Sequence, residues 1–278
     1  MAGQARRKHM AILALNSAAT GLRALSTRID VIANNIANAE TTAFKRSRMN
    51  FEDLMYLTLK DPGGLNNAND PSPAGTQVGL GTKISNTQVD LEQGPLETTN
   101  RALDVAIQGP GFFRVKIPDS ISDGTGYTRN GNFFTNSKGQ LVVGNGEGYL
   151  LLPSIVIPPN AHDIGINQQG VIEFTLPGQN TKSQVGPLKL TTFVNPQGLK
   201  LLGGSIYVET PASGKPIDNK PNENGVGSIL QNFLEGSNVD PVKELVTLIK
   251  TQRSFELNSQ VIQTADQALQ TIGNLRRF

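Results

Sequence analysis

The sequence lacks cysteine altogether and contains only two histidines among its 278 residues. Without cysteine, neither a disulfide nor a thiolate can contribute to folding or chemistry. His9 lies near the N-terminus and His162 in a Pro-Asn-Ala-His-Asp segment. A zinc or catalytic site needs several such groups that converge, so we expect no metal site, no cofactor site and no histidine-based catalysis.

An excess of charge of either sign is also missing. The 25 basic and 23 acidic side chains leave a formal charge of +2. A nucleic-acid-binding protein needs a concentrated basic face to neutralise phosphates, so we expect no nucleic-acid partner. The one basic cluster, Arg6-Arg7-Lys8, is expected to lie in a solvated N-terminal tail.

No run of 18 or more apolar residues is present, so the sequence predicts no membrane-spanning helix. Residues 10–15 form a short apolar run after the basic cluster, which resembles a secretory signal. An apolar stripe with helical spacing continues through Asn16, however, and cleavage soon after it would cut that helix. If the protein leaves the cytoplasm, we expect export without a cleaved signal peptide.

Acidic residues are the remaining candidates for catalysis, and four lie in one stretch: Asp90, Glu92, Glu97 and Asp104. A glycosidase needs two suitably spaced carboxylates, but acidic residues scattered along strands are ordinarily solvated. The glycine-rich segment 109–111 is followed by neither the lysine nor the helix start of a phosphate loop. We interpret it as a sharp turn that brings Phe112 and Phe113 into a core. A glycan-acting enzyme is kept only as an alternative.

What the sequence does have is an apolar stripe with helical spacing at each end. The N-terminal stripe recurs every three or four residues: Leu15, Ala18, Leu22, Leu25, Ile29, Ile32 and Ile36. The C-terminal stripe recurs largely every seven: Leu245, Leu248, Ile249, Phe255, Ile262, Ala265, Leu269 and Ile272. We predict one helix from about Met10 to Asn38, and a second that starts near Asp240 with Pro241 at its first position.

Each stripe is the face on which a helix packs against a partner. The two helices could pair within one molecule or with helices of other copies, and periodicity alone leaves both open. Uncharged polar residues in the second stripe favour assembly, because such groups fix register and partner number: Thr251, Gln252, Asn258 and Ser259. Gly21 costs the first helix about 1 kcal/mol relative to alanine, which suggests a close neighbour there.

The middle of the chain is rich in glycine, proline and short apolar runs, which is typical of an all-β unit. The predicted strands are residues 103–107, 112–117, 140–143, 149–152, 155–157, 171–174, 189–193 and 205–208. The motif Asn-x-x-Gly occurs at 136–139, 167–170 and 195–198. Asparagine opening a turn and glycine closing it at positive φ predicts three hairpin connections.

Residues 50–97 mix signals and are expected to form an extended arm. Its apolar start, which includes Phe51, Leu54 and Tyr56, fits a helix or a strand equally, and a polar, loop-like stretch follows. The expected fold is α+β: terminal helices that form a coiled-coil-like assembly domain, an inserted, mainly-β middle domain and the arm. The expected boundaries are 1–49 for the N-terminal helical segment, 50–97 for the arm, 98–225 for the β domain and 226–278 for the C-terminal helical segment.

Local sequences along nearly the whole chain are also specific. They are residues 17–22 (Ser-Ala-Ala-Thr-Gly-Leu), 30–38 (Asp-Val-Ile-Ala-Asn-Asn-Ile-Ala-Asn), 41–46 (Thr-Thr-Ala-Phe-Lys-Arg), 103–109 with 111–113, 127–133, 235–240 and 252–256. In this order they resemble the bacterial flagellar axial proteins, the family of rod and hook subunits. The turn of the N-terminal family motif corresponds here to Asn34, Asn35, Asn38, Thr42, Phe44 and Lys45.

Two features depart from the family pattern, and one points to a subgroup. Ala43 stands where the family usually has glycine, and residues 1–9 have no family counterpart. Residues 51–56 and the polar stretch after them are similar to the insertion of the distal rod members. A proximal rod or hook subunit of the same family is the alternative.

The resemblance implies a structural subunit without enzymatic activity, exported by the flagellar type III apparatus. Copies would stack into a helical tube that crosses the periplasm in the basal body, inside the P- and L-ring proteins, and connects the motor to the hook. The partners would be other copies, proximal rod proteins and the hook protein, with no small-molecule substrate. The apolar stripes would pack between subunits, and arm residues Phe51, Leu54 and Tyr56 would bridge to neighbours.

Overall fold

The computed structural model describes residues 2–63, 74–121, 123–178 and 181–274, with the backbone alone for residues 2–12 and 272–274. The chain divides into two compact units. Unit 1 comprises Met1–Ile36, Ser47–Gln88 and Pro241–Phe278, and unit 2 comprises Ala37–Arg46 and Val89–Asp240. Within the described part of the chain, no helix is both long and apolar enough to cross a membrane.

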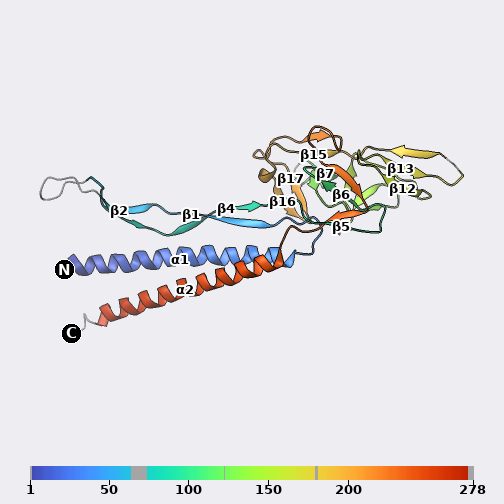
Figure 1. Ribbon diagram of the computed structural model, residues 1–278. Helices are drawn as coiled ribbons and strands as arrows, with labels where there is room; N and C mark the ends of the chain where they lie inside the picture. Colours follow the sequence, from blue (N-terminus) through green and yellow to red (C-terminus); the bar gives the residue numbers. More distant parts are fainter. Residues whose placement is uncertain (1, 64–73, 122, 179–180, 275–278) are drawn as a thin grey trace. The chain divides into compact units, whose positions relative to one another are not determined.

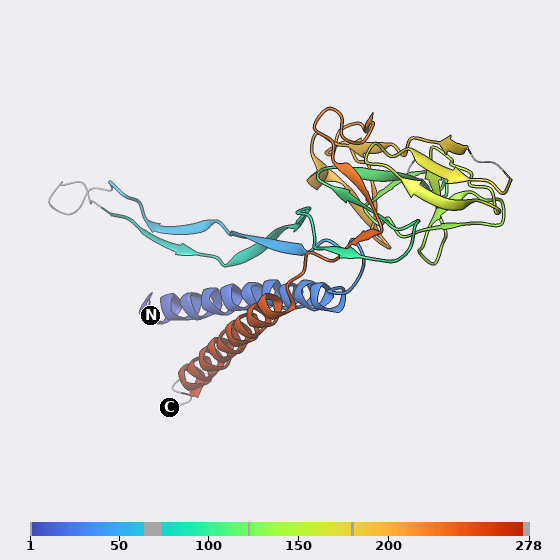
Figure 2. The ribbon, with the colours of Figure 1, turned by 45° about the vertical axis from the view of Figure 1, so that its right-hand side comes forward.

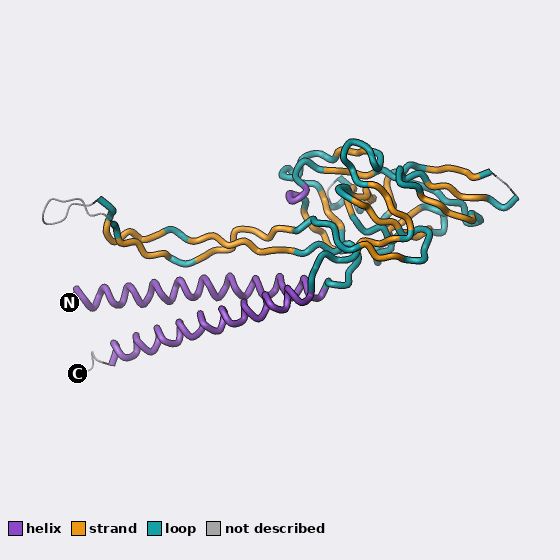
Figure 3. The backbone as a smooth tube through the Cα atoms, in the orientation of Figure 1, coloured by secondary structure: helices purple, strands orange, loops and turns teal. Residues whose placement is uncertain are grey.

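Unit 1 contains two long helices and a narrow two-stranded ribbon (Figures 1 and 3). The helices are α1 (Ala2–Ala37) and α2 (Pro241–Asn274). In the ribbon, β1 (Ser47–Asp53) pairs with β4 (Thr82–Val89), and β2 (Tyr56–Lys60) pairs with β3 (Thr76–Gly79). The two predicted helices are therefore confirmed, and the start of the arm is strand.

Helix α1 begins earlier than the sequence suggested. The expected tail over Arg6-Arg7-Lys8 was wrong, because the helical backbone already starts at Ala2. Alanine, glutamine, arginine and lysine all have high helix propensity, so the helix includes residues 2–9 as well.

Within unit 1 the two helices run antiparallel (Figure 2). A Cβ atom added to Gly21 of α1 would lie 3.5 Å from Asn258 Nδ2 of α2. Fourteen residues further along α1, Asn35 Nδ2 lies 3.4 Å from Glu244 Oε2, fourteen residues back along α2. One chain thus brings its own helices together, and Gly21 has the close neighbour that was expected.

The ribbon contacts α1 through polar and aromatic side chains. The backbone N–H of Thr82 donates to Thr20 Oγ1 (3.3 Å), and Arg28 Cζ lies 5.8 Å from the centroid of the Phe51 ring. Gly81 has a φ of 117°, and a Cβ atom there would overlap Thr20 Oγ1. Only glycine permits both this conformation and this approach.

Unit 2 consists of short antiparallel strands. Its nine-stranded sheet is formed by β7 (Phe112–Lys116), β8 (Thr125–Thr128), β9 (Phe133–Thr135), β10 (Leu141–Val143), β11 (Leu150–Leu152), β15 (Leu190–Thr192), β16 (Lys200–Gly203), β17 (Ile206–Val208) and β18 (Ile217–Asn219). The strand order is β16-β17-β8-β7-β11-β10-β9, and β15 pairs with both β7 and β18.

Smaller sheets complete unit 2. One pairs β12 (His162–Ile166) with β13 (Ile172–Thr175) and β13 with β14 (Lys182–Val185). In the others, β6 (Val105–Gln108) pairs with β19 (Ser228–Gln231), and β5 (Leu96–Thr98) pairs with β20 (Phe233–Glu235). Residues 226–240, which were expected to belong with the C-terminal helix, are therefore part of unit 2, as are residues 89–97 of the expected arm.

Two of the three predicted Asn-x-x-Gly hairpins are confirmed. Residues 136–139 connect the paired strands β9 and β10, and residues 167–170 connect β12 and β13, with Gly139 and Gly170 at φ of 74° and 78°. The third was wrong, because residues 196–198 form one turn of 3₁₀ helix, η1 (Pro196–Gly198), and β15 and β16 do not pair. Gly198 serves close packing instead, since a Cβ atom there would lie 2.6 Å from the carbonyl carbon of Ala212.

One predicted strand is absent from the described structure. Residues 155–157 make only an isolated bridge between Val156 and Gln140, although Ile155 and Ile157 are both buried. Pro153 and Pro158 flank this segment, and proline cannot donate to a strand ladder. The other seven predicted strands overlap observed ones. In the same unit, β5, β8, β9, β12, β14, β16 and β18 to β20 were missed.

Two apolar clusters fill unit 2, and β7 contributes to both. Phe113 joins the larger one and Phe112 the smaller, because successive side chains point to opposite faces of a strand. The turn at 109–111 therefore delivers two buried aromatic residues, as predicted. In the smaller cluster, the ring centroids of Tyr127 and Phe193 are 4.8 Å apart, and those of Phe112 and Tyr207 are 5.6 Å apart.

The buried tyrosines predict loss of stability at alkaline pH. Burial, with Glu209 nearby, raises the pKa of Tyr127 from 10.0 to about 12. Between these values the folded form holds a proton that the unfolded chain releases, so stability present below pH 10 falls as pH rises through about 12. The full loss would be about 3 kcal/mol. Urea unfolding at a series of pH values should show a shallower decline for Tyr127→Phe than for the wild type. The control Tyr56→Phe, in unit 1, should leave the decline of unit 2 unchanged; an equal effect of both would contradict this assignment.

Candidate functional site

Unit 2 is connected to unit 1 at four places in the chain: after Ile36, Arg46, Gln88 and Asp240. The residues of unit 2 that flank these connections bond to one another and to Arg129. We call this group the junction cluster: Lys45, Arg46, Asp90, Glu92, Arg129, Glu235 and Asn238. All of its members belong to unit 2.

Glu235 is the centre of the junction cluster. Its carboxylate accepts hydrogen bonds from Lys45 Nζ (2.5 Å), Arg129 Nε (2.7 Å) and the backbone N–H of Gly94 (3.0 Å). The side chains of Lys45 and Glu235 are fully buried, and that of Arg129 is 4% exposed. Buried charges are tolerated only when they are paired and hydrogen-bonded, so these three side chains depend on one another.

Backbone carbonyls satisfy the other donors of the two cations. Lys45 Nζ donates to Glu92 O (2.6 Å), and Arg129 Nη1 donates to Gly109 O (3.1 Å) and Gly111 O (2.9 Å). Both glycines have positive φ, which side-chain-bearing residues rarely adopt. The glycine turn therefore serves Arg129 as well as the core.

Burial and charge act against each other in this cluster. Burial lowers the pKa of Lys45 below its ordinary value, the Glu235 carboxylate opposes that shift, and the nearby Arg129 guanidinium adds to it. For Asp90, burial raises the pKa, but hydrogen bonds from Arg46 and from the backbone of Glu92 keep it below its ordinary value. The charged state of each group thus depends on partners from another segment.

Asn238 links three segments of the cluster. Its Oδ1 accepts from the backbone N–H of Arg46 (2.7 Å), and its Nδ2 donates to the carbonyls of Asp90 (2.8 Å) and Glu92 (3.1 Å). Arg46 Nη2 also donates to Asp90 Oδ2 (2.7 Å), and the N–H of Asp90 donates to Arg46 O (2.8 Å). The segments around residues 45, 91 and 236 are thereby bonded to one another.

Ala43 has the positive φ that the family motif implies, although it is not glycine. Its φ is 57°, its side chain is fully buried, and its N–H donates to Glu235 O (2.8 Å). This conformation costs an L-residue about 1–2 kcal/mol. The hydrogen bonds of the adjoining Lys45 and Glu235 hold the chain in this conformation.

Asn35, another residue of the N-terminal motif, pairs with the start of the ribbon. It is 1% exposed, its Oδ1 accepts from the N–H of Ser47 (3.0 Å), and its Nδ2 donates to Ser47 O (2.9 Å). One side-chain amide thus bonds to both backbone groups of a strand residue, as a neighbouring strand would. This interaction fixes α1 to β1 within unit 1.

The remaining motif residues lie at the surface of α1 or in the turn after it. Asn34 is an exposed residue of α1, and Asn38 Oδ1 accepts from Thr41 Oγ1 (3.1 Å). The carbonyl of Thr42 accepts from Ser205 Oγ (3.2 Å), and that of Phe44 accepts from the N–H of Asn238 (3.4 Å). Lys45 is therefore the motif residue whose side chain lies at the centre of the cluster.

The predicted packing residues of the helices are covered to different extents. In α1, Ile32 is 4% exposed, and five others are half-buried: Leu15, Leu22, Leu25, Ile29 and Ile36. In α2, Leu248, Ile262 and Leu269 are half-buried, whereas Leu245 and Phe255 are 47% and 36% exposed. The side chain of Ile272 lies outside the described residues.

A further set of apolar residues on α2 is exposed. Val246 is 46% exposed, Ile249 57%, Leu257 64% and Val261 47%. At about 100° per residue, these four residues and Leu245 lie within about one half of the helix circumference. We call these five residues the exposed α2 stripe; Leu245 and Ile249 also belong to the C-terminal stripe predicted from the sequence.

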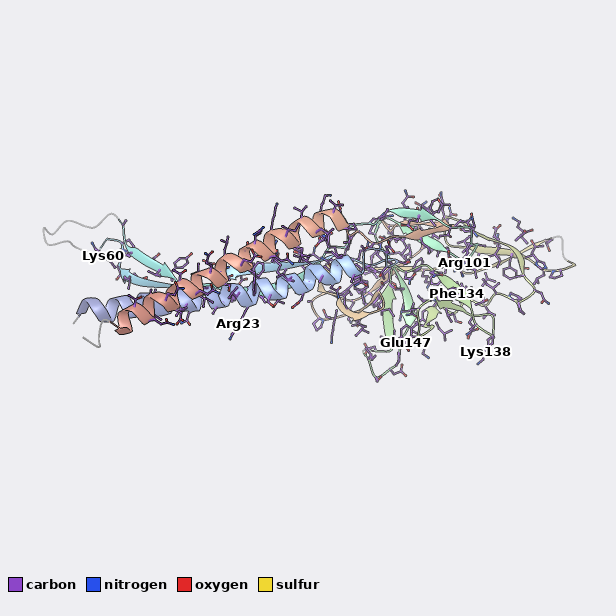
Figure 4. All side chains as sticks on the ribbon, turned by 90° about the horizontal axis from the view of Figure 1, so that it is seen from below. Arg23, Lys60, Arg101, Phe134, Lys138 and Glu147 are labelled. Atoms are coloured by element: carbon purple, nitrogen blue, oxygen red, sulfur yellow. The ribbon has the colours of Figure 1, made fainter. Side chains whose placement is uncertain are left out.

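The arm also exposes apolar side chains. Met55 is 83% exposed, Tyr56 54%, Leu57 42% and Leu59 54%, up to Lys60 at the end of β2 (Figure 4). Phe51 and Leu54, the other predicted arm residues, are half-buried. Exposed apolar patches of this kind mark interaction surfaces in soluble proteins.

Sequence reasoning selected Lys45 but did not assign a site role to its ion-pair partner Glu235 or to Arg129 and Asn238 of the same cluster. Lys45 and Glu235 are 190 positions apart, and no spacing rule connects residues so distant. A usable signal was present, because Arg129 and Glu235 both lie in the specific local sequences 127–133 and 235–240. Among the described residues, no three histidine, cysteine or acidic side chains are grouped to hold a metal ion.

Family models match the chain in three regions. The model for "Flagella basal body rod protein" matches residues 15–45, that for "Flagellar hook protein FlgE/F/G D1 domain" matches 106–174, and that for "Flagellar basal body rod FlgEFG protein C-terminal" matches 230–275. The first and third include Lys45 and Glu235 respectively. The matched regions thus include both residues of the buried ion pair between Lys45 and Glu235.

Curated relatives match over nearly the full length. Flagellar basal-body rod protein FlgG of Buchnera aphidicola (subspecies Schizaphis graminum) is 44% identical over 92% of this chain and 96% of its own. The FlgG protein of Caulobacter vibrioides is 44% identical over 95% and 99%, and that of Bacillus subtilis is 35% identical over 95% and 98%. Their class is that of structural proteins of the flagellum, not enzymes. The chain belongs to the FlgG family of flagellar basal-body rod proteins.

Substitutions at Ala43 test the positive-φ turn. Ala43→Val should destabilise unit 2 by about 2–4 kcal/mol, because a β-branched residue is disfavoured at positive φ and the site has no spare room. Ala43→Gly should change stability by less than about 1 kcal/mol, since relief of strain offsets the lost methyl group and the added chain entropy. Ala37→Val, at an exposed position, is the matched control. Urea unfolding measures all three, and equal effects of the two valine substitutions would contradict the assigned turn.

Proposed function

We propose that this chain is a subunit of the distal part of the flagellar rod, and that its copies polymerise into a helical tube that transmits motor torque to the hook. The observation that carries this proposal is identity of about 44% with FlgG rod proteins over more than nine-tenths of the chain. The polymer would lie in the basal body and cross the periplasm. Subunits would reach it through the type III export apparatus without a cleaved signal peptide.

The helices supply the apolar surface that assembly needs. We propose that the exposed α2 stripe and the predicted packing residues of both helices, from Leu15 to Ile36 and from Leu245 to Ile272, pack between subunits. Full burial of one leucine or isoleucine side chain contributes about 1.5–3 kcal/mol. Several such residues per subunit would outweigh the entropy lost on association.

The proposed place of the subunit in the distal rod implies its partners. One end of the polymer would contact proximal rod proteins and the other the hook protein, while the P- and L-ring proteins would surround it. Residues 1–36 and 241–278 would supply the inner assembly segments, unit 2 the outer domain, and residues 47–88 the bridge between subunits. The helical backbone of residues 2–9 would extend the inner assembly segment.

Charge substitutions on the exposed α2 stripe test this assembly. The double variant Ile249→Asp, Leu257→Asp should change monomer stability little, because both positions are exposed. It should weaken polymerisation at least a hundredfold, since about 3 kcal/mol or more of apolar burial is lost. Electron micrographs of basal bodies from a strain with only this variant should lack the outer shaft and the hook. Gln263→Asp, an exposed polar position of the same helix, should assemble normally. Normal shafts from the double variant would contradict the role of this stripe.

The arm distinguishes a distal rod subunit from a hook subunit. Residues 54–81 can be replaced by Asn-Gly, which favours a tight hairpin. The replacement retains all of β1, which ends at Asp53, and all of β4, which begins at Thr82. The hydrogen bond from Leu54 N–H to Gly81 O (2.9 Å) in the unaltered chain places these two ends close enough for a tight turn. We expect shafts that still assemble but bend, because the apolar arm no longer bridges neighbours. Curvature in electron micrographs measures the effect, with the unaltered chain as control. Unchanged straightness would count against the distal rod and favour a proximal rod or hook subunit.

A further inference from the structure

The four connections between the units end at one small group of residues in unit 2. The first two lie at either end of residues 37–46, the third is followed by Asp90 and Glu92, and the fourth is preceded by Glu235 and Asn238. Each of these segments is bonded to the other two. Ala43 and Lys45 bond to Glu235, Arg46 bonds to Asp90, and Asn238 bonds to both Arg46 and Asp90.

The cluster is also anchored in the sheet of unit 2. Arg129 follows β8, donates to Glu235, and donates to the carbonyls of Gly109 and Gly111, which precede β7. β20 ends at Glu235 and pairs with β5, and Gly236 N–H donates to Pro95 O (2.8 Å). The connecting segments are therefore joined both to each other and to the β structure.

We infer that the junction cluster is a mechanical clamp that fastens all four connections together, so that a force on any one of them is shared by all and passed into the sheet. The physical reason is the mutual dependence of its charges. Releasing Lys45 would remove one of the three donors that bond to the buried Glu235 carboxylate, and releasing the Glu235 segment would leave two buried cations without their carboxylate. Detachment of one segment from the cluster therefore also weakens the ion pairs and hydrogen bonds of the other segments. The use of this clamp under torque rests on the proposed function.

Amide hydrogen exchange on the full monomer tests the clamp itself. In the wild type, the peptides covering residues 37–46, 89–95 and 235–240 should exchange with one common opening rate and protection. In Lys45→Met, all three should exchange at least tenfold faster together, although the substitution removes only one side chain from one segment. Arg114→Met, which removes the partly exposed pair with Asp218 in the same unit, is the control and should leave all three peptides unchanged. Acceleration confined to residues 37–46 would overturn the clamp.

A second variant covers the case in which Lys45→Met does not fold. Asn238→Ala keeps the three buried charges and removes the side-chain bonds to Arg46, Asp90 and Glu92. Amide hydrogen exchange of the same three peptides should become faster together in this variant. In a strain carrying Asn238→Ala, shafts of normal length should form, and swimming should fail in viscous medium sooner than with the wild-type chain. Swimming equal to wild type under load would overturn the mechanical role. Failure of the wild-type chain to restore shafts would instead contradict the proposed function and leave the exchange result to decide the clamp.

Discussion

A single buried carboxylate, that of Glu235, organises the part of unit 2 where the chain enters and leaves. It receives an ammonium group from residue 45, a guanidinium group from residue 129 and a backbone N–H from residue 94. Breaking a buried ion pair by removing one partner costs about 3–5 kcal/mol, a large part of the stability of a typical domain. The glycine turn at 109–111, the positive φ of Ala43 and the three bonds of the Asn238 side chain all serve this arrangement.

The two units meet opposite physical demands. Unit 2 has two buried apolar clusters and pairs the buried charges of Lys45, Arg129 and Glu235 with one another. Unit 1 leaves apolar side chains of α2 and of the arm exposed to solvent. Such surfaces are a cost for a monomer and an advantage for a polymer, because their burial is available only to an assembled chain.

Local patterns predicted elements well and long-range interactions poorly. The helices followed from three- and four-residue spacing, and seven strands from short apolar runs between glycine, proline and asparagine. The turn at residues 136–139 was predicted correctly, whereas the same motif at 195–198 was not a hairpin, because Pro196 and the close approach of Ala212 decide its conformation. The partners of Lys45 were not predictable, since they lie on segments that only the complete fold brings together. Glycine at position 21 was predictable as a close contact, but not the identity of Asn258 opposite it.

The discontinuity of unit 2 has a practical consequence for recombinant work. Residues 37–46 belong to it but are separated in the chain from residues 89–240. A contiguous fragment spanning 89–240 would leave out Lys45, and the buried Glu235 would lose one of its two cationic donors. An isolated outer domain should therefore be produced with the ten-residue peptide 37–46 grafted by a linker or supplied in trans. A circularly permuted gene that places this peptide beside residue 240 offers a third route.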